Sequence, residues 1–183
     1  MSAWWILGIV VLLLAMLAWL YNVLVTARMR VRNAWAQIDV QMLRRSDLIP
    51  DLVESVKGYM KHEGGIFDRI LESRRAATAA GADIPARAAA EAALGRQVQG
   101  LLALAEAVPE LRASDTVKTL QEELTTTENR IAFARQFFND AVLDYNTRIQ
   151  TVPSNLLAGP FGFAPEGFFE APAEARAKPV VAF

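Results

Sequence analysis

The longest uninterrupted pattern in the chain is an apolar run that passes directly into an amphipathic one. Residues 3–25 read AWWILGIVVLLLAMLAWLYNVLV, and the first charged side chain is Arg28. As a helix this run would measure about 35 Å, against about 30 Å for the hydrocarbon core of a bilayer. Aromatic rings favour the membrane interface, and four lie near the two ends of the run: Trp4, Trp5, Trp19 and Tyr21. We therefore predict a transmembrane anchor over residues 1–27.

The flanks of the run argue against a cleaved signal peptide and give the anchor a direction. A signal peptide has a basic start, a shorter apolar region and a small-residue cleavage site, and this run has none of them. Arg28, Arg30 and Arg32 follow its C-terminal end. Positive charges stay on the cytoplasmic side, so we expect the N-terminus outside and the rest of the chain in the cytoplasm. The three arginines could also contact anionic headgroups.

Beyond the anchor, apolar residues recur every three or four positions in four segments, which is the period of amphipathic helices. The first segment continues the anchor through Val31, Trp35, Ile38 and Met42; the later stripes run over residues 49–70, 94–105 and 117–149. Short stretches that contain helix-breaking residues separate the segments. The pattern predicts an all-α fold: an N-terminal transmembrane helix continuous with an antiparallel four-helix bundle over residues 28–152.

The connection between the first two bundle helices has two interpretations. Ser46 or Asp47 can cap a new helix, and Pro50 is tolerated in a first turn. This favours a reversal of the chain at Arg45–Leu48. In the alternative, the first helix only kinks at Pro50 and the chain reverses at Gly64–Gly65. We favour the first interpretation.

Polar residues interrupt the apolar seam of the last helix. Thr127 and Glu128 stand where the spacing calls for an apolar side chain. A polar layer inside a bundle can fix the register of its helices at some cost in stability. We predict such a buried layer here; the alternative is a contact with a ligand or partner.

The C-terminal region, residues 153–183, is rich in Phe, Pro and Gly and has no helical stripe. Four of its phenylalanines would be costly to expose to water: Phe161, Phe163, Phe168 and Phe169. We expect them to pack on the bundle, and the alternative is a docking segment for another protein. The last part, residues 171–183, is predicted to be disordered.

Composition and motifs exclude several functions. The net charge of −1 gives no basis for general nucleic-acid binding. The chain has no cysteine, which excludes disulfides, thiolate metal ligands and thiol catalysis. The only histidine, His62, precedes Glu63, but Ile66 occupies the position of the second ligand of an H-E-x-x-H zinc motif. We therefore predict no enzymatic activity and no cofactor; an enzyme using His62 and Glu63 is the minor alternative.

Two long stretches resemble the LemA family. They are YNVLVTARMRVRNAWAQIDVQMLRRSDLIPDLVESVKGYMKHE and ENRIAFARQFFNDAVLDYNTRIQTVP, the second followed by FGF and FFE. The resemblance covers Tyr21 to Glu170. It implies a bacterial single-pass membrane protein with a short N-terminal tail and an antiparallel four-helix domain, hence a place in the cell's inner membrane. A related protein of magnetosome-forming bacteria is associated with building internal membranes. The family has no agreed enzymatic activity, so it supplies no catalytic residues.

An anchor joined to a bundle without a catalytic constellation predicts a scaffold. We expect a membrane-anchored adaptor that acts through protein contacts at the cytoplasmic face, its partner being an unidentified protein or a second copy of the chain. The alternative is a membrane-remodelling or lipid-binding protein that self-assembles at the bilayer, with Arg28–Arg32 as its contact.

Overall fold

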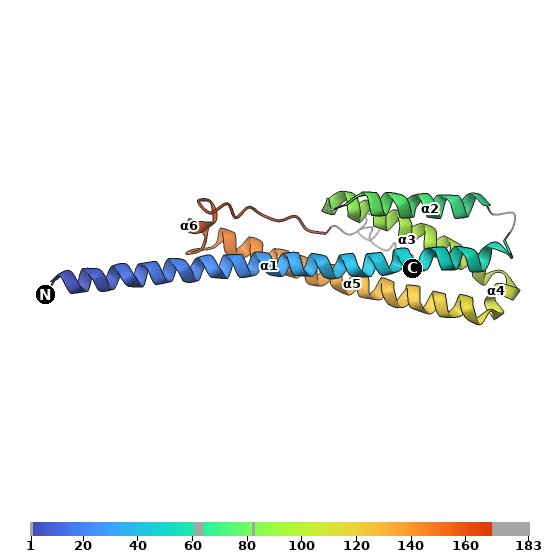
Figure 1. Ribbon diagram of the computed structural model, residues 1–183, viewed down its shortest axis with the longest axis horizontal. Coiled ribbons are helices and arrows are strands. Elements are labelled where there is room, and N and C mark those ends of the chain that lie inside the picture. The colour runs from blue at the N-terminus through green and yellow to red at the C-terminus, as the bar shows by residue number, and fades with distance from the viewer. Residues whose placement is uncertain (1, 61–63, 82, 170–183) are drawn as a thin grey trace, which may run out of the picture. The chain divides into compact units, whose positions relative to one another are not determined.

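The computed structural model describes residues 2–60, 64–81 and 83–169, with side chains from residue 4 onward. Its helices, labelled in Figure 1, are α1 (Ser2–Lys57), α2 (Gly64–Ala79), α3 (Ile84–Glu106), α4 (Pro109–Ala113), α5 (Asp115–Gln150) and α6 (Asn155–Ala158). The described residues contain no strand. The predicted all-α class is confirmed. The stretch predicted to be disordered lies outside the described residues.

Helix α1 is longer than the sequence pattern suggested. Its 56 residues run without a break through Arg45–Leu48 and Pro50, so the favoured reversal at Arg45–Leu48 is wrong. The helix ends at Lys57, where the backbone N–H groups of Tyr59 and Met60 both donate to the Val56 carbonyl at 3.1 Å. The chain then reverses before α2 begins at Gly64, close to the position of the alternative interpretation.

An arginine of α2 explains why α1 tolerates Pro50. Proline has no N–H, so the carbonyl four residues earlier, on Ser46, loses its helical donor. The Nε of Arg74 donates to this carbonyl at 2.8 Å and to the Ser46 hydroxyl at 3.0 Å. Since Ser46 is buried, an unpaired carbonyl there would be costly. The guanidinium therefore takes over the role of the missing amide.

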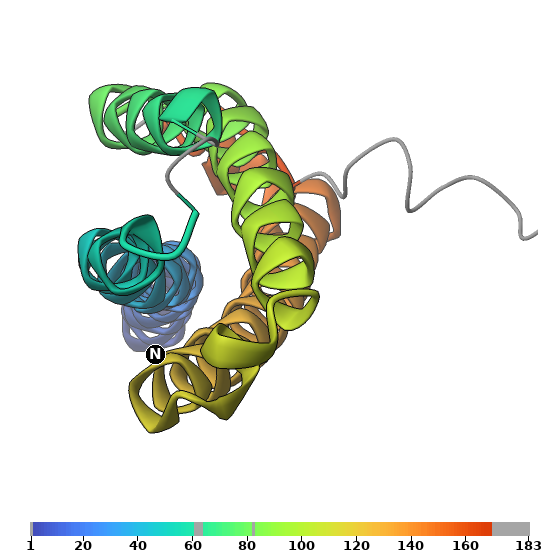
Figure 2. The ribbon, with the colours of Figure 1, turned by 90° about the vertical axis from the view of Figure 1, so that its right-hand side faces the viewer.

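The chain divides into two compact units, to which both α1 and α5 contribute. Within the part of the chain that the structure describes, the first unit combines residues 2–37 with 134–168, and the second combines residues 38–133 with Phe169. The second unit holds a hydrophobic core built by residues of α1 to α5, helices that are drawn in Figure 2. Its members include Ile49, Leu52 and Val56 of α1, Phe67 and Ile70 of α2, Leu94, Val98 and Leu101 of α3, Leu111 of α4, and Val117 and Leu124 of α5. Burying one such side chain contributes roughly 1.5–3 kcal/mol.

The first unit packs the middle of α1 against the end of α5 and the segment after it. Its buried apolar residues include Leu20, Leu24, Val31, Phe138, Val142, Tyr145, Ile149 and Phe163. The rings of Trp35 and Phe138 add a contact with centroids 5.6 Å apart. Packing of α1 thus begins at Leu20, inside the stretch predicted as the anchor, whereas residues 4–19 are exposed throughout.

Candidate functional site

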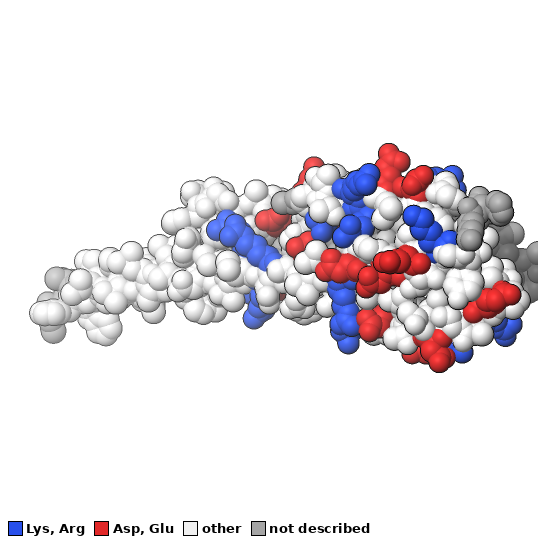
Figure 3. Space-filling model, turned by 45° about the vertical axis from the view of Figure 1, so that its right-hand side comes forward, with Lys and Arg blue, Asp and Glu red and all other residues white. Residues whose placement is uncertain are grey.

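The N-terminal part of α1 exposes apolar side chains on every face. Within the described part of the chain, α1 is the one helix long and apolar enough to cross a membrane. Figure 3 shows this end of the molecule without charged surface. Trp4, Trp5 and Trp19 are exposed by 79%, 76% and 62%. Tyr21 differs from them, because its ring meets the rings of Phe161 and Phe163 edge-on, with centroids 5.2 and 5.8 Å away.

The three arginines that follow the apolar stretch have different surroundings. The guanidinium of Arg28 lies over the ring of Phe163, 4.7 Å from its centroid, a cation–π contact. Arg30 lies with a guanidinium nitrogen 4.0 Å from the Asp144 carboxylate. Arg32 is exposed. Arg28 therefore contributes to packing, whereas Arg30 and Arg32 are accessible cations.

The segment after α6 is fastened to α5 by hydrogen bonds. The Tyr145 hydroxyl donates to the Ala164 carbonyl, and the Asn146 side chain donates to the Glu166 carbonyl and accepts from its N–H, all at 2.9 Å. This holds Phe163 in the core of the first unit. Of the four predicted docking residues, Phe163 and Phe169 are buried, whereas Phe161 and Phe168 remain 56% and 46% exposed.

Tyr145 makes the stability of the fold sensitive to pH in the alkaline range. Burial raises the pKa of its phenol, as Glu166 does, while Arg28 and Arg32 act in the opposite direction. Because this pKa is higher in the folded chain than in the unfolded chain, the unfolded chain loses the proton first. The contribution of Tyr145 to stability is therefore fully present below about pH 10 and is lost as the pH rises above it. We expect the free energy of unfolding of Tyr145→Phe to fall less steeply with rising pH than that of the wild type. Chemical unfolding of the full chain in detergent between pH 8 and 11 measures this. Tyr59→Phe, at an exposed position, is the matched control, and equal alkaline slopes for the two variants would contradict this assignment.

A layer of charged side chains crosses the core of the second unit. Arg45 and Glu91 are both 2% exposed and form an ion pair, and the same Nη2 of Arg45 also donates to the Glu91 backbone carbonyl at 3.0 Å. The Nη1 of Arg45 donates to Glu128 at 2.6 Å. Arg87 extends the layer, with its Nε 3.4 Å from Glu91 and its Nη2 2.8 Å from Asp39. We call Asp39, Arg45, Arg87, Glu91 and Glu128 the charged layer.

Of the polar pair predicted from the α5 seam, Glu128 belongs to this layer and Thr127 precedes it in the chain. Thr127 is 1% exposed, and its hydroxyl donates to the Glu123 carbonyl at 2.7 Å. The Glu128 side chain is 41% exposed but reaches Arg45. Sequence reasoning missed Arg45 and Glu91, although both stand at core spacing, Arg45 three residues after Met42 and Glu91 three before Leu94. Three facing helices thus each place a polar residue on their apolar face.

The charged layer pairs two guanidinium groups with three carboxylates and suits a structural role. Its ion pairs join α1, α3 and α5 at one level, which can fix their register. The described residues hold no group of three or more His, Asp or Glu that could bind a metal ion. His62 and Glu63, the residues of the minor enzyme hypothesis, lie outside the described part of the chain.

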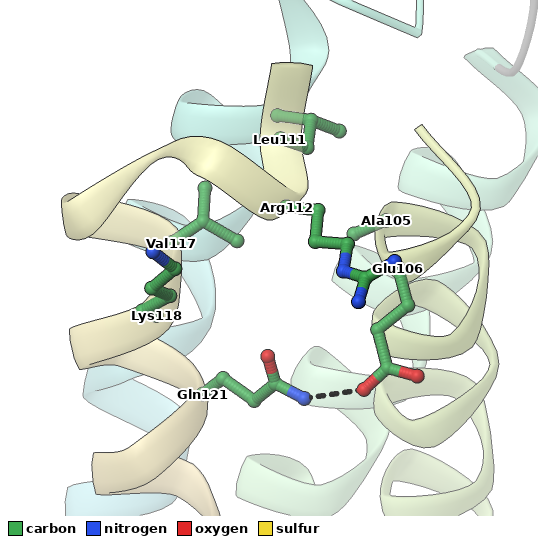
Figure 4. Close-up of a pocket in the computed structure, with 7 residues that line it drawn as sticks. All are labelled: Ala105, Glu106, Leu111, Arg112, Val117, Lys118 and Gln121. Atoms are coloured by element: carbon green, nitrogen blue, oxygen red, sulfur yellow. Dashed lines mark hydrogen bonds between the residues drawn. The ribbon is translucent and has the colours of Figure 1, made fainter. Parts of the chain in front are cut away.

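A separate cavity of about 430 Å³ lies where α3, α4 and α5 meet. Figure 4 shows the buried side chains of Ala105, Leu111 and Val117 among its walls, with Arg112 and Lys118 also lining it. A hydrogen bond from the Gln121 amide to the Glu106 carboxylate, 2.6 Å long, crosses one side. The cavity combines apolar walls with polar groups, a common property of ligand sites.

These features define a class of protein: an all-helical chain whose exposed apolar N-terminal helix continues into a packed helical domain. The chain belongs to the LemA family, whose sequence model matches residues 34–183, and the predicted family is confirmed. It is similar to the magnetosome proteins MamQ 2 and MamQ 1 of Paramagnetospirillum magneticum, at 27% identity over an alignment 186 residues long. This alignment covers 88% of this chain and 68% of each relative. It is also similar to the magnetosome protein MamQ of Magnetospirillum gryphiswaldense, at 27% identity over 179 residues, 84% of this chain and 66% of the relative.

Proposed function

We propose that the protein is a membrane-anchored helical scaffold that acts through protein contacts and performs no catalysis. In this proposal the apolar part of α1 crosses the inner membrane of a bacterial cell once, with the N-terminus outside. The helices beyond it form an antiparallel four-helix bundle in the cytoplasm. The partner is an unidentified protein or a second copy of the chain.

The observation that carries the proposal is the exposure of residues 4–19. A soluble protein rarely leaves an apolar surface of this extent in water. In the hydrocarbon core of a membrane, exposure of the same side chains is favourable. The arginines after Ala27 support the cytoplasmic orientation. In the second unit the buried charges of Arg45 and Glu91 pair with each other, which supports a role in assembly.

The absence of cysteine from the chain allows a direct test of topology. Single cysteines are introduced by Ser2→Cys and by Asp115→Cys, the latter at a side chain that is 98% exposed. A membrane-impermeant maleimide should label the first variant in spheroplasts and the second only after lysis. Labelling of Asp115→Cys in intact spheroplasts would overturn the orientation, and extraction of the protein by alkaline carbonate would overturn the anchor.

The scaffold role has its own test. Crosslinking of the full chain in native membranes should give discrete species above the monomer, and the same species should form from purified protein if the partner is a second copy. A monodisperse monomer without crosslinked partners under both conditions would contradict the scaffold.

Membrane remodelling is the second candidate, favoured by the exposed cations Arg30 and Arg32 and by the magnetosome relatives. Its test is deformation of liposomes by the full-length protein, compared with Arg30→Gln/Arg32→Gln. Arg28 is left unchanged because it packs on Phe163. Liposomes that keep their shape with the wild type would rule this candidate out.

A further inference from the structure

A groove in the first unit lies at the level where the exposed apolar stretch of α1 ends. It has a volume of about 230 Å³ and is lined by Trp19, Asn22, Thr26 and Arg30 of α1 and by Arg148 of α5. A helix that enters the hydrocarbon at Trp4 leaves it about 20 residues later. In the proposed single span, the groove would therefore open at the cytoplasmic headgroup region. This position makes a lipid headgroup a candidate occupant.

The charges of the groove favour a monoanion. Asp144 accepts from the Nε of Arg148 with both carboxylate oxygens, each at 2.9 Å, and the nearest approach of Arg30 to it is 4.0 Å. Two guanidinium groups thus face one carboxylate, which leaves one positive charge unbalanced. The Nη groups of Arg148, which carry most of its donors, have no hydrogen-bond partner among the described residues. Guanidinium groups match the geometry of phosphate oxygens.

The first unit also exposes apolar side chains. Trp19 is 62% exposed beside Asn22 and Thr26, and the residues that follow α5 leave Val152, Leu156 and Phe161 exposed by 77%, 70% and 56%. The ring of Phe161 packs on Tyr21, which keeps it at the same level of α1. Exposed apolar side chains next to cations are suited to the boundary between acyl chains and headgroups.

We propose that the groove binds the headgroup of an anionic glycerophospholipid, with Arg30 and Arg148 on the phosphodiester. The side chains of Asn22 and Thr26 supply polar contacts for the glycerol hydroxyls, and Trp19 lies along the first part of an acyl chain. A phosphatidylglycerol headgroup carries the single negative charge that the groove lacks, whereas phosphatidylcholine has no net charge. The inference rests on the proposed membrane anchor for the level of the groove, and on the contacts above for its ligand.

The test is a titration of the full-length protein in a neutral detergent, followed by its thermal unfolding. Dioleoyl phosphatidylglycerol should stabilise the wild type saturably, and dioleoyl phosphatidylcholine should not. Arg30→Gln and Arg148→Gln should each weaken the apparent affinity for phosphatidylglycerol about tenfold, as expected for loss of one charge-assisted contact. Arg32→Gln, which removes a nearby exposed charge that does not line the groove, should change it by less than about twofold.

Three results would overturn the proposal. Equal weakening by Arg32→Gln would mean surface attraction without a site, and equal stabilisation by free glycerol phosphate would mean a site for a soluble phosphate. Absence of saturable stabilisation by phosphatidylglycerol would mean no site at all. Arg30→Gln keeps the test valid if Arg148→Gln fails to fold, since Arg30 is 65% exposed with only a 4.0 Å ion pair. Flotation with phosphatidylcholine liposomes separately tests the anchor, so the failure of one proposal is distinguishable from the failure of the other.

Discussion

Arg45→Met is expected to lower the free energy of unfolding of the protein by about 3 kcal/mol. The substitution leaves the Glu91 carboxylate 2% exposed and without its closest cation, and uncompensated buried charges are among the most costly defects of a protein core. The expected loss lies at the lower end of the range usual for removing one partner of a buried ion pair, because the Nε of Arg87 remains 3.4 Å from Glu91. Chemical unfolding of the full chain in detergent, followed by circular dichroism, measures the effect.

The double variant Arg45→Met/Glu91→Leu separates the cost of the orphaned charge from the cost of altered packing. It removes both members of the buried pair and should recover most of the stability, since well-packed apolar residues often replace a buried ion pair without loss. Glu128→Gln is the matched control, because the Glu128 side chain is 41% exposed and should cost less than about 1 kcal/mol. A double variant as unstable as Arg45→Met would show that altered packing, and not the unpaired charge of Glu91, causes most of the loss of stability.

The all-helical class was predictable from the sequence because it depends on local periodicity. Apolar side chains at steps of three and four identify helices wherever they occur, and the absence of charge before Arg28 identifies a stretch that hydrocarbon would accept. The family was recognisable from the same residues. Each of these conclusions uses neighbours in sequence and requires no knowledge of which helices meet.

The misplaced reversal shows where local signals mislead. Ile38, Met42, Arg45, Ile49, Leu52 and Val56 follow one another at alternating steps of four and three, which is the pattern of a single helix. The interruption was predicted because Ser46 or Asp47 can cap a new helix and Pro50 is tolerated in a first turn. The groups that make these residues acceptable inside α1 are Glu91 and Arg74, 46 and 28 residues away from their partners. A single sequence does not reveal such pairings.

The segment after α5 was unpredictable for a different reason. Without a helical or strand period, nothing in the spacing distinguishes the buried Phe163 from the exposed Phe161. Their difference arises from the bonds of Tyr145 and Asn146 to the backbone of this segment and from the position of Arg28 over one ring.

The contact between Arg74 and Ser46 can be tested through Pro50, because the arginine is needed only while the helical donor is missing. Arg74→Met should cost about 1–3 kcal/mol in the wild type, the loss expected for a buried carbonyl left without a donor. In a Pro50→Ala background the alanine N–H can donate to Ser46, so the same substitution should cost less than half as much. Pro50→Ala alone should be neutral or stabilising, since alanine favours the helix interior.

The double-mutant cycle isolates this coupling from other roles of the arginine, and unfolding of the four proteins under one condition measures it. Arg75→Met, at the exposed neighbouring position of α2, is the control and should have little effect in either background. Strict additivity of Arg74→Met and Pro50→Ala would mean that the carbonyl of Ser46 does not depend on the guanidinium. A positive coupling would establish that α1 passes Pro50 unbroken because α2 supplies the hydrogen bond that proline cannot.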